Sequence, residues 1–175
     1  MLKNQIEKKA LEVLNSLETL EAPIPIKSII KSFGIKLSPY DLGEDVSGVL
    51  VIDNDNCKIG YNSTESYSRQ RFTLAHELGH YILHKNKQQE VFVDNITYMF
   101  RKTSSKNKDY KIEMEANQFA AAILMPKSLI EKELEKLDDG FVNDHNLISE
   151  LSKKFKVSQI AMTYRLNNLG YFYDF

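Results

Sequence analysis

Two histidines and a glutamate in the middle of the chain have the spacing of a metal site. They form the motif His76-Glu77-Leu78-Gly79-His80. On a helix, side chains four residues apart lie on one face, about 6 Å apart along the axis, so both imidazoles can bind one zinc ion. Glu77 projects from the neighbouring part of that face, where it can take a proton from water at the metal without being a ligand itself. Because the composition predicts only about 0.01 such motifs by chance, a metal site is favoured over a pair of structural histidines.

A hydrolytic zinc site needs a third protein ligand and an open position for water. His84 continues the series, but it lies about 12 Å along the helix from the first histidine of the motif, which is too far. Glu113 and Glu115 begin a later helix and point about 200° apart, so only one of them can face the metal. The Glu113 face continues through small residues and Asn117, which could hydrogen-bond a ligand histidine. We therefore favour Glu113, keep Glu115 as the alternative, and expect the other acid to be solvated.

The elements that must hold these residues follow from the spacing of apolar side chains. That spacing predicts helices over 2–17, 26–33, 66–85, 111–125, 126–137, 147–155 and 158–169. Short strands are predicted over 35–37, 48–52, 58–61 and 90–93, with a loop covering most of 86–110. The fold class is therefore α+β, with a small antiparallel sheet and the motif on a helix. We divide the chain into a main domain, 1–140, and a C-terminal helical subdomain, 141–175, packed on it.

The composition is that of an ordinary globular chain. Of 175 residues 42% are apolar, and 23 basic side chains stand against 24 acidic ones, for a net charge of −1. Such a balance excludes a disordered chain and offers no overall attraction for nucleic acid. The single cysteine, Cys57, is typical of a reducing compartment, and we find neither a membrane-spanning run nor a signal peptide. We expect a cytoplasmic protein.

Two linked motifs resemble those of a known family. The sequence RFTLAHELGH over 71–80, followed by E-x-x-A-N-x-F-A over 113–120 and LMP over 124–126, resembles the ImmA/IrrE family of zinc metallopeptidases. The resemblance implies a zincin-like core of the gluzincin type, with His76, His80 and Glu113 as zinc ligands and Glu77 as general base. Several members of the family cleave a partner repressor of the helix-turn-helix type and are encoded by phages, integrative elements or stress regulons. The implied substrate is therefore a cognate repressor.

The expected reaction is hydrolysis of a peptide bond without a covalent intermediate. A group that stabilises the oxyanion is also needed, and the sequence leaves five residues open for this role: Tyr81, Tyr110, Tyr164, His145 and Arg165. The predicted strand over 58–61 leads directly into the motif helix. We therefore expect it to be the sheet edge on which an extended substrate adds as a further strand.

Two other functions compete with this one. The stretch 147–166 resembles a helix-turn-helix unit, but residues 143–175 carry a net charge of only +1, which argues against direct DNA binding. We expect its apolar residues to cover the peptidase core or to bind the repressor: Phe155, Val157, Ile160, Met162, Leu166 and Leu169. The other alternative is a non-proteolytic zinc protein, a regulator or antitoxin that acts by binding its partner. A structural zinc site would not need Glu77, which favours the enzyme.

Overall fold

The computed structural model describes residues 1–53, 56–85, 90–95, 107–136 and 144–171, with the side chains of 90, 95, 107–109, 144 and 145 left undescribed. Within these ranges the chain forms helices and a four-stranded sheet, a mixed α+β fold. The helices are α1 (Lys3–Leu14), α2 (Ile26–Ser32), α3 (Tyr67–His84), α4 (Asn107–Leu124), α5 (Lys127–Leu134), α6 (Asp144–Phe155) and α7 (Gln159–Leu169). The strands are β1 (Lys36–Tyr40), β2 (Val46–Asp53), β3 (Asn56–Asn62) and β4 (Glu90–Asn95).

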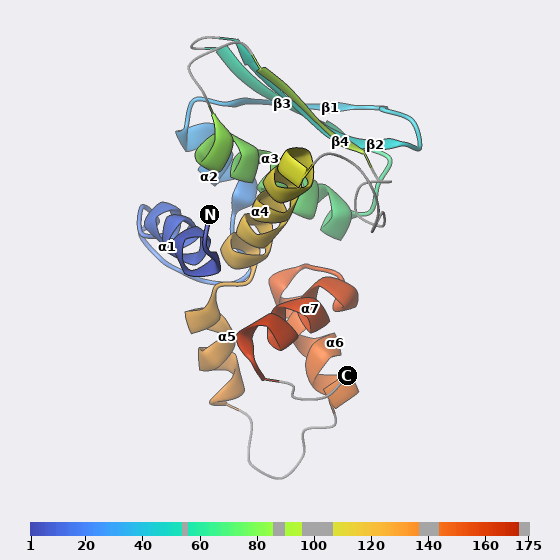
Figure 1. Cartoon of the computed structure of the whole chain (residues 1–175). Coiled ribbons are helices and arrows are strands. Elements are labelled where there is room, and N and C mark those ends of the chain that lie inside the picture. Colours follow the sequence, from blue (N-terminus) through green and yellow to red (C-terminus); the bar gives the residue numbers. More distant parts are fainter. Residues whose placement is uncertain (54–55, 86–89, 96–106, 137–143, 172–175) are drawn as a thin grey trace.

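The layers are simple. The sheet forms one end of the molecule, α3 and α4 cross beneath it, and α5, α6 and α7 lie at the opposite end (Figure 1). Every helix and strand predicted from the sequence is present. The main shift is in α4, which begins at Asn107, one turn earlier than predicted, so part of the predicted loop is helical. Residues 86–89 and 96–106 lie outside the described residues.

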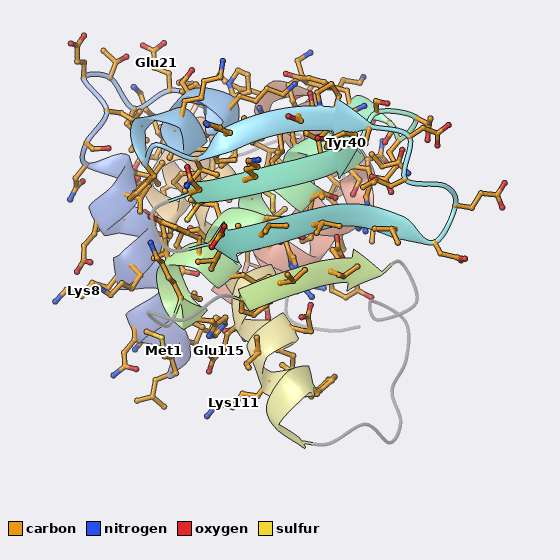
Figure 2. All side chains as sticks on the ribbon, turned by 90° about the horizontal axis from the view of Figure 1, so that it is seen from above. Met1, Lys8, Glu21, Tyr40, Lys111 and Glu115 are labelled. Atoms are coloured by element: carbon orange, nitrogen blue, oxygen red, sulfur yellow. The ribbon has the colours of Figure 1, made fainter. Side chains whose placement is uncertain are left out.

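The sheet differs from the expected antiparallel one. Its strand order is β1-β3-β2-β4, visible from above in Figure 2, and β1 pairs parallel to β3 while the other pairs are antiparallel. The parallel pair arises because the chain runs from β1 to β2 and then returns as β3 between these two strands, in the same direction as β1. The buried Asn62 holds this crossing, since its side-chain amide donates to the carbonyl oxygens of Gly43 at 2.7 Å and Val46 at 3.1 Å.

This order overturns the prediction that the strand over 58–61 is a sheet edge. Those residues belong to β3, which is paired on both sides, so no substrate strand can add there. The edges among the described strands are β1 and β4. Of the two, β4 is next to the motif helix, because the ring of its Phe92 stacks on that of His80 at 4.6 Å between centroids.

The motif helix α3 is enclosed on two sides. Its residues 73–80 are all buried, under β2 on one side and against α4 on the other. The approach to the sheet depends on Gly48 of β2. A Cβ at this position would overlap the methyl group of Thr73 and lie 3.1 Å from Oε1 of Glu77. Glycine therefore lets the strand lie directly on the helix.

The C-terminal helices α6 and α7 are joined by residues 156–158. Lys156 has a positive φ of 55°, Ser158 caps α7 by accepting a hydrogen bond from the amide of Ala161, and Gly170 ends the helix with a φ of 84°. Of the apolar residues predicted to cover the core or to bind the repressor, all are buried or partly buried except Ile160, which is 71% exposed and therefore does not cover the core. Its binding of a repressor stays a prediction. The residue is on the outer face of α7. The proposed boundary at 140/141 lies outside the described residues.

None of the helices in the described ranges is both long enough and apolar enough to cross a membrane.

Replacing Gly48 by alanine tests the contact between strand and helix. We expect Gly48→Ala to lower the free energy of unfolding by about 1–3 kcal/mol, because neither the buried Thr73 nor the strand can move away easily. Gly60→Ala in β3 is the matched control. Its Cβ would lie 3.1 Å from the ring of Tyr40, a side chain that is 54% exposed and free to swing away. Urea denaturation of both variants measures the difference, and equal losses would contradict the proposed role of Gly48.

Candidate metal centre

The close contact between α3 and α4 brings the candidate ligands together. It occurs at Gly79, where a Cβ would lie 3.1 Å from the carbonyl oxygen of Ala116 and 3.2 Å from its Cα. Because Gly79 has no side chain, the backbone of α4 can lie directly against α3. At this spacing a side chain from one helix can reach those of the other.

Three donor atoms converge beside this contact. Nε2 of His76 and Nε2 of His80 lie 2.9 Å apart, and the carboxylate of Glu113 places one oxygen 3.2 Å from the first and the other 3.3 Å from the second. Both histidines are 1% exposed. Two imidazole nitrogens and one carboxylate at such distances could hold a metal ion, and this donor set suits zinc with a position left open.

A hydrogen bond at the other ring nitrogen of His76 fixes the orientation of its imidazole. Its Nδ1 lies 2.9 Å from Oδ1 of Asn117, one turn after Glu113 on α4. Because the amide oxygen can only accept, Nδ1 carries a proton, and Nε2, which points toward the other two donors, is the nitrogen that a metal would bind after it loses its own proton. The sequence analysis anticipated this partner.

Glu77 is buried beside the three donors. It is fully buried, and neither carboxylate oxygen has a hydrogen-bond partner among the described residues. An unpartnered buried carboxylate is costly, and burial raises the pKa of Glu77 to about 8. Such a group needs a cation or a water molecule nearby. Its chemistry fits a base that takes a proton from water.

The protonation states of His76, His80 and Glu113 depend on one another. Burial alone lowers the pKa of His76, but the hydrogen bond to Glu113 and the surrounding carboxylates outweigh it and raise that pKa to about 9. Burial lowers the pKa of His80. For Glu113, hydrogen bonds from both histidines overcome the effect of burial and lower the pKa to about 2. In the absence of metal, the protonated His76 therefore balances the ionised Glu113, and a metal ion would displace that proton.

The sequence analysis missed Asp94. This carboxylate, 3% exposed on β4, lies within 4.8 Å of donor atoms of His76 and Glu77. It accepts a hydrogen bond from Nη2 of Arg69 at 3.4 Å, and the same guanidinium donates to Ser47 at 2.6 Å. Phe92 and Asp94 are two residues apart on β4, so the alternation of side chains along a strand predicts that both lie on one face. The sequence does not show that this face meets the motif helix.

Glu115 is the acid that turns away from the three donors. It is 7% exposed, so the prediction that it is solvated was wrong. Its carboxylate binds the amino group of Met1, next to it in Figure 2, and lies 3.7 Å from Nε2 of His84. Burial, helped by the neighbouring His80, lowers the pKa of His84 to about 4. Both residues belong to the contact between α1, α3 and α4.

The residues left open as oxyanion stabilisers are scattered. Tyr110 is the best placed, one turn before Glu113 on α4 and 50% exposed. Tyr81 packs against Phe33, and Tyr164 is 67% exposed on α7. Arg165 is buried and donates a hydrogen bond to the carbonyl oxygen of Met125. The side chain of His145 lies outside the described residues.

Comparison with known proteins identifies the family of the chain. Residues 30–167 match the family model of the IrrE N-terminal-like domain, Peptidase_M78. The chain belongs to this family of metallopeptidases. Its matched region contains the histidine motif, Glu113, α6 and all but the last two residues of α7.

Several relatives are similar over long stretches. The chain is 26% identical over 159 residues to metallopeptidase ImmA of Bacillus subtilis, covering 84% of this chain and 85% of that protein. It is 34% identical over 114 residues to the radiation response metalloprotease IrrE of Deinococcus radiodurans, covering 65% of this chain but only 32% of IrrE. It is 32% identical over 92 residues to an uncharacterized immunity region protein of Bacillus phage phi105, covering 53% of this chain and 52% of that protein.

A solved structure shares the fold. A Mycobacterium tuberculosis transcriptional regulator superposes with a TM-score of 0.57 at 17% identity, over 94% of this chain and 46% of the regulator.

The protonation of His76 in the metal-free site predicts how metal binding depends on pH. The hydrogen bond to Glu113 and the nearby carboxylates raise the pKa of His76 to about 9, so below about pH 9 the metal must displace a proton from His76. The apparent dissociation constant for zinc should therefore fall about tenfold per pH unit between roughly pH 6 and pH 9. Competition with a chelator of known affinity measures it. Glu115→Gln should show the same slope, because Glu115 lies outside the three donors. A dissociation constant independent of pH would contradict the assignment.

Proposed function

We propose that the chain is a zinc-dependent endopeptidase that cleaves a cognate helix-turn-helix transcriptional repressor. The observation that carries this proposal is the convergence of His76, His80 and Glu113 beside a buried, unpartnered Glu77. We assign the first three as metal ligands and Glu77 as the general base. The family and the names of the relatives support proteolysis, and the phage immunity region and the radiation response support a role in switching phage, mobile-element or stress genes. A repressor as substrate places the reaction in the cytoplasm.

In this mechanism each residue has one task. A bound zinc ion would polarise the peptide carbonyl and make water more acidic. Glu77 removes a proton from the attacking water, whose oxygen bonds to the carbonyl carbon, and delivers that proton to the nitrogen that leaves as the C–N bond breaks. Because water is the nucleophile, no acyl-enzyme forms. Asn117 holds His76 in the tautomer that keeps Nε2 free, and Asp94 with Arg69 fixes β4 beside the base. We assign the core to the gluzincin type, and α6 with α7 to a helix-turn-helix-like subdomain over 141–175.

Substitution of the three acids tests these roles separately. We expect Glu77→Gln to abolish cleavage while zinc content stays at that of the wild type, because Glu77 is not a ligand. Glu113→Gln should lose both zinc and cleavage. Glu115→Gln is the matched control and should keep both. The measurement is the intact mass of the repressor encoded beside the gene, after co-expression with each variant, together with the zinc content of each purified protein.

The outcomes separate the two candidate functions. A discrete cut by the wild type that Glu77→Gln abolishes locates the scissile bond. A repressor that remains whole with the wild type, yet binds the wild type and Glu77→Gln equally, would replace the peptidase by a non-proteolytic regulator.

We further propose that the substrate adds to β4 as an extended strand. Within the described part of the chain β4 is paired on one side only, and its Phe92 and Asp94 flank the two histidines. Peptides spanning the mapped cut, N-methylated at one position each, test this. Because alternate amides of an added strand face the partner, KM should rise at every second position next to the cut. Equal effects at all positions would exclude strand addition.

A further inference from the structure

Two buried arginines outside the metal centre connect it to the C-terminal helices. Arg71 of α3 is 4% exposed and Arg165 of α7 is 2% exposed. A guanidinium is removed from water at a high cost unless hydrogen bonds replace the lost hydration. Both side chains make such bonds. Those of Arg71 join the α6–α7 pair to α3, and one of those of Arg165 joins it to the end of α4. Each of these two helices carries a candidate ligand.

Arg71 joins α6 to the motif helix. It lies five residues before His76, and its Nε donates to the carbonyl oxygen of Lys156 at 3.2 Å, while Nη2 lies 3.5 Å from that of Phe155. These carbonyls are at the end of α6, where they have no partner within the helix and where the helix dipole favours a positive charge. A charged donor from α3 therefore caps α6.

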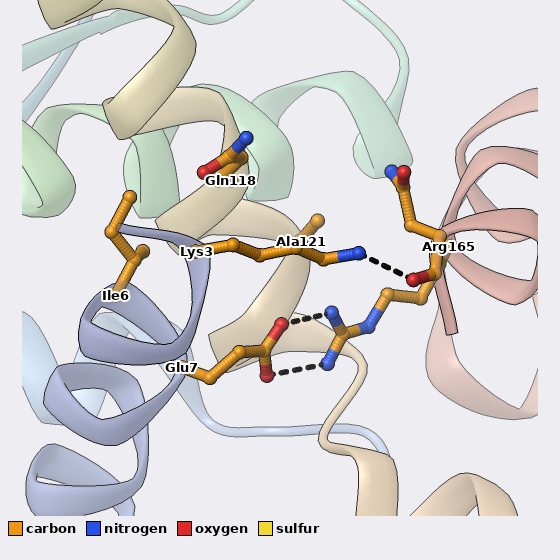
Figure 3. Close-up of a pocket in the computed structure, with 7 residues that line it drawn as sticks. Lys3, Ile6, Glu7, Gln118, Ala121 and Arg165 are labelled. Atoms are coloured by element: carbon orange, nitrogen blue, oxygen red, sulfur yellow. Dashed lines mark hydrogen bonds and ion pairs between the residues drawn. The ribbon is translucent and has the colours of Figure 1, made fainter. Parts of the chain in front are cut away.

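Arg165 joins α7 to the helix that carries Glu113. Its Nε donates to the carbonyl oxygen of Met125, directly after the end of α4, at 2.9 Å. Its two remaining nitrogens bind the carboxylate of Glu7 on α1, the pair drawn with dashed lines in Figure 3. The helix pair is thus hydrogen-bonded both to α3 and to the end of α4.

These contacts are far from the close approach of the two ligand helices at Gly79. The helices α3 and α4 pack extensively on each other. Arg71 and Met125 lie about 12 Å and about 14 Å from the contact between Gly79 and Ala116, measured along their helices. Contacts at these distances act on the crossing angle of the two helices with long lever arms. A rotation of about 5° moves Glu113 by about 0.4 Å relative to the histidines, close to the tolerance of a functional site.

We propose that Arg71 and Arg165 are positioning residues that brace α3 and α4 against the α6–α7 pair and thereby fix the angle at which the histidines meet Glu113. The inference rests on the proposed metal site. It gives the C-terminal helices a task in the peptidase: they set the geometry of a site whose candidate metal ligands all lie on α3 and α4.

Metal affinity and coordination geometry test the brace. We expect Arg71→Met and Arg165→Met to weaken zinc binding roughly 3- to 30-fold, measured by chelator competition well below the melting temperature. With saturating Co²⁺, their visible absorption band should differ from that of the wild type, because it reports the coordination geometry of folded protein only. Arg71→Lys, which keeps a charged donor, should recover part of the affinity.

Lys154→Met is the matched control. Lys154 binds Glu133 of α5, so its loss loosens the helix pair from a helix without a candidate ligand, and both readouts should stay at wild-type values. If Arg71→Met does not fold, the comparison of Arg71→Lys with Lys154→Met carries the test. Wild-type affinity and spectrum in the folded arginine variants would overturn the brace. Failure of the wild type itself to bind zinc would instead overturn the proposed metal site.

Discussion

The structure depends on how closely α3 and α4 can approach each other. Imidazoles from one helix and a carboxylate from the other meet only because Gly79 has no side chain and Ala116 has a small one. A second close approach, at Gly48, lets the sheet lie on the opposite side of α3. Together they enclose a helix whose middle is wholly buried and includes the proposed site residues His76, Glu77 and His80. Packing and chemistry therefore constrain the same few positions.

The gathering of several acidic side chains around the two buried histidines favours the binding of a cation. Glu77, Glu113 and Asp94 are gathered around two histidines, and Arg69 is bound to Asp94. Several carboxylates so close together repel one another unless a positive charge is present. In the metal-free protein His76 supplies it by holding a proton. The site is thus more complementary to a divalent ion than to water, which agrees with membership of a metallopeptidase family.

The parts of the site that follow from helical periodicity could be predicted, and the parts that depend on the order of strands could not. The spacing of His76 and His80 places them on one face whatever surrounds the helix, and the same rule distinguishes Glu113 from Glu115. Asp94 was missed because β4 reaches the histidines only through its pairing with β2, a contact between residues far apart in sequence. For the same reason β3 was taken for an edge. Ile160 shows a further limit, since an apolar residue on an amphipathic helix can still lie on its outer face.

The contacts of α1 have a consequence for how the chain folds during synthesis. This helix packs on α4, and its Glu7 and Lys3 bind Arg165 and the carbonyl of Asn168 on α7. Translation makes α1 before any of these partners, so its apolar stripe, which includes Ile6 and Ala10, has no docking surface until α4 has left the ribosome. The polar contacts to α7, which span more than 150 residues, also form late in folding, because closing so long a loop is entropically unfavourable. Ribosome-bound chains that lack α4 should therefore be the most exposed to chaperones and proteases.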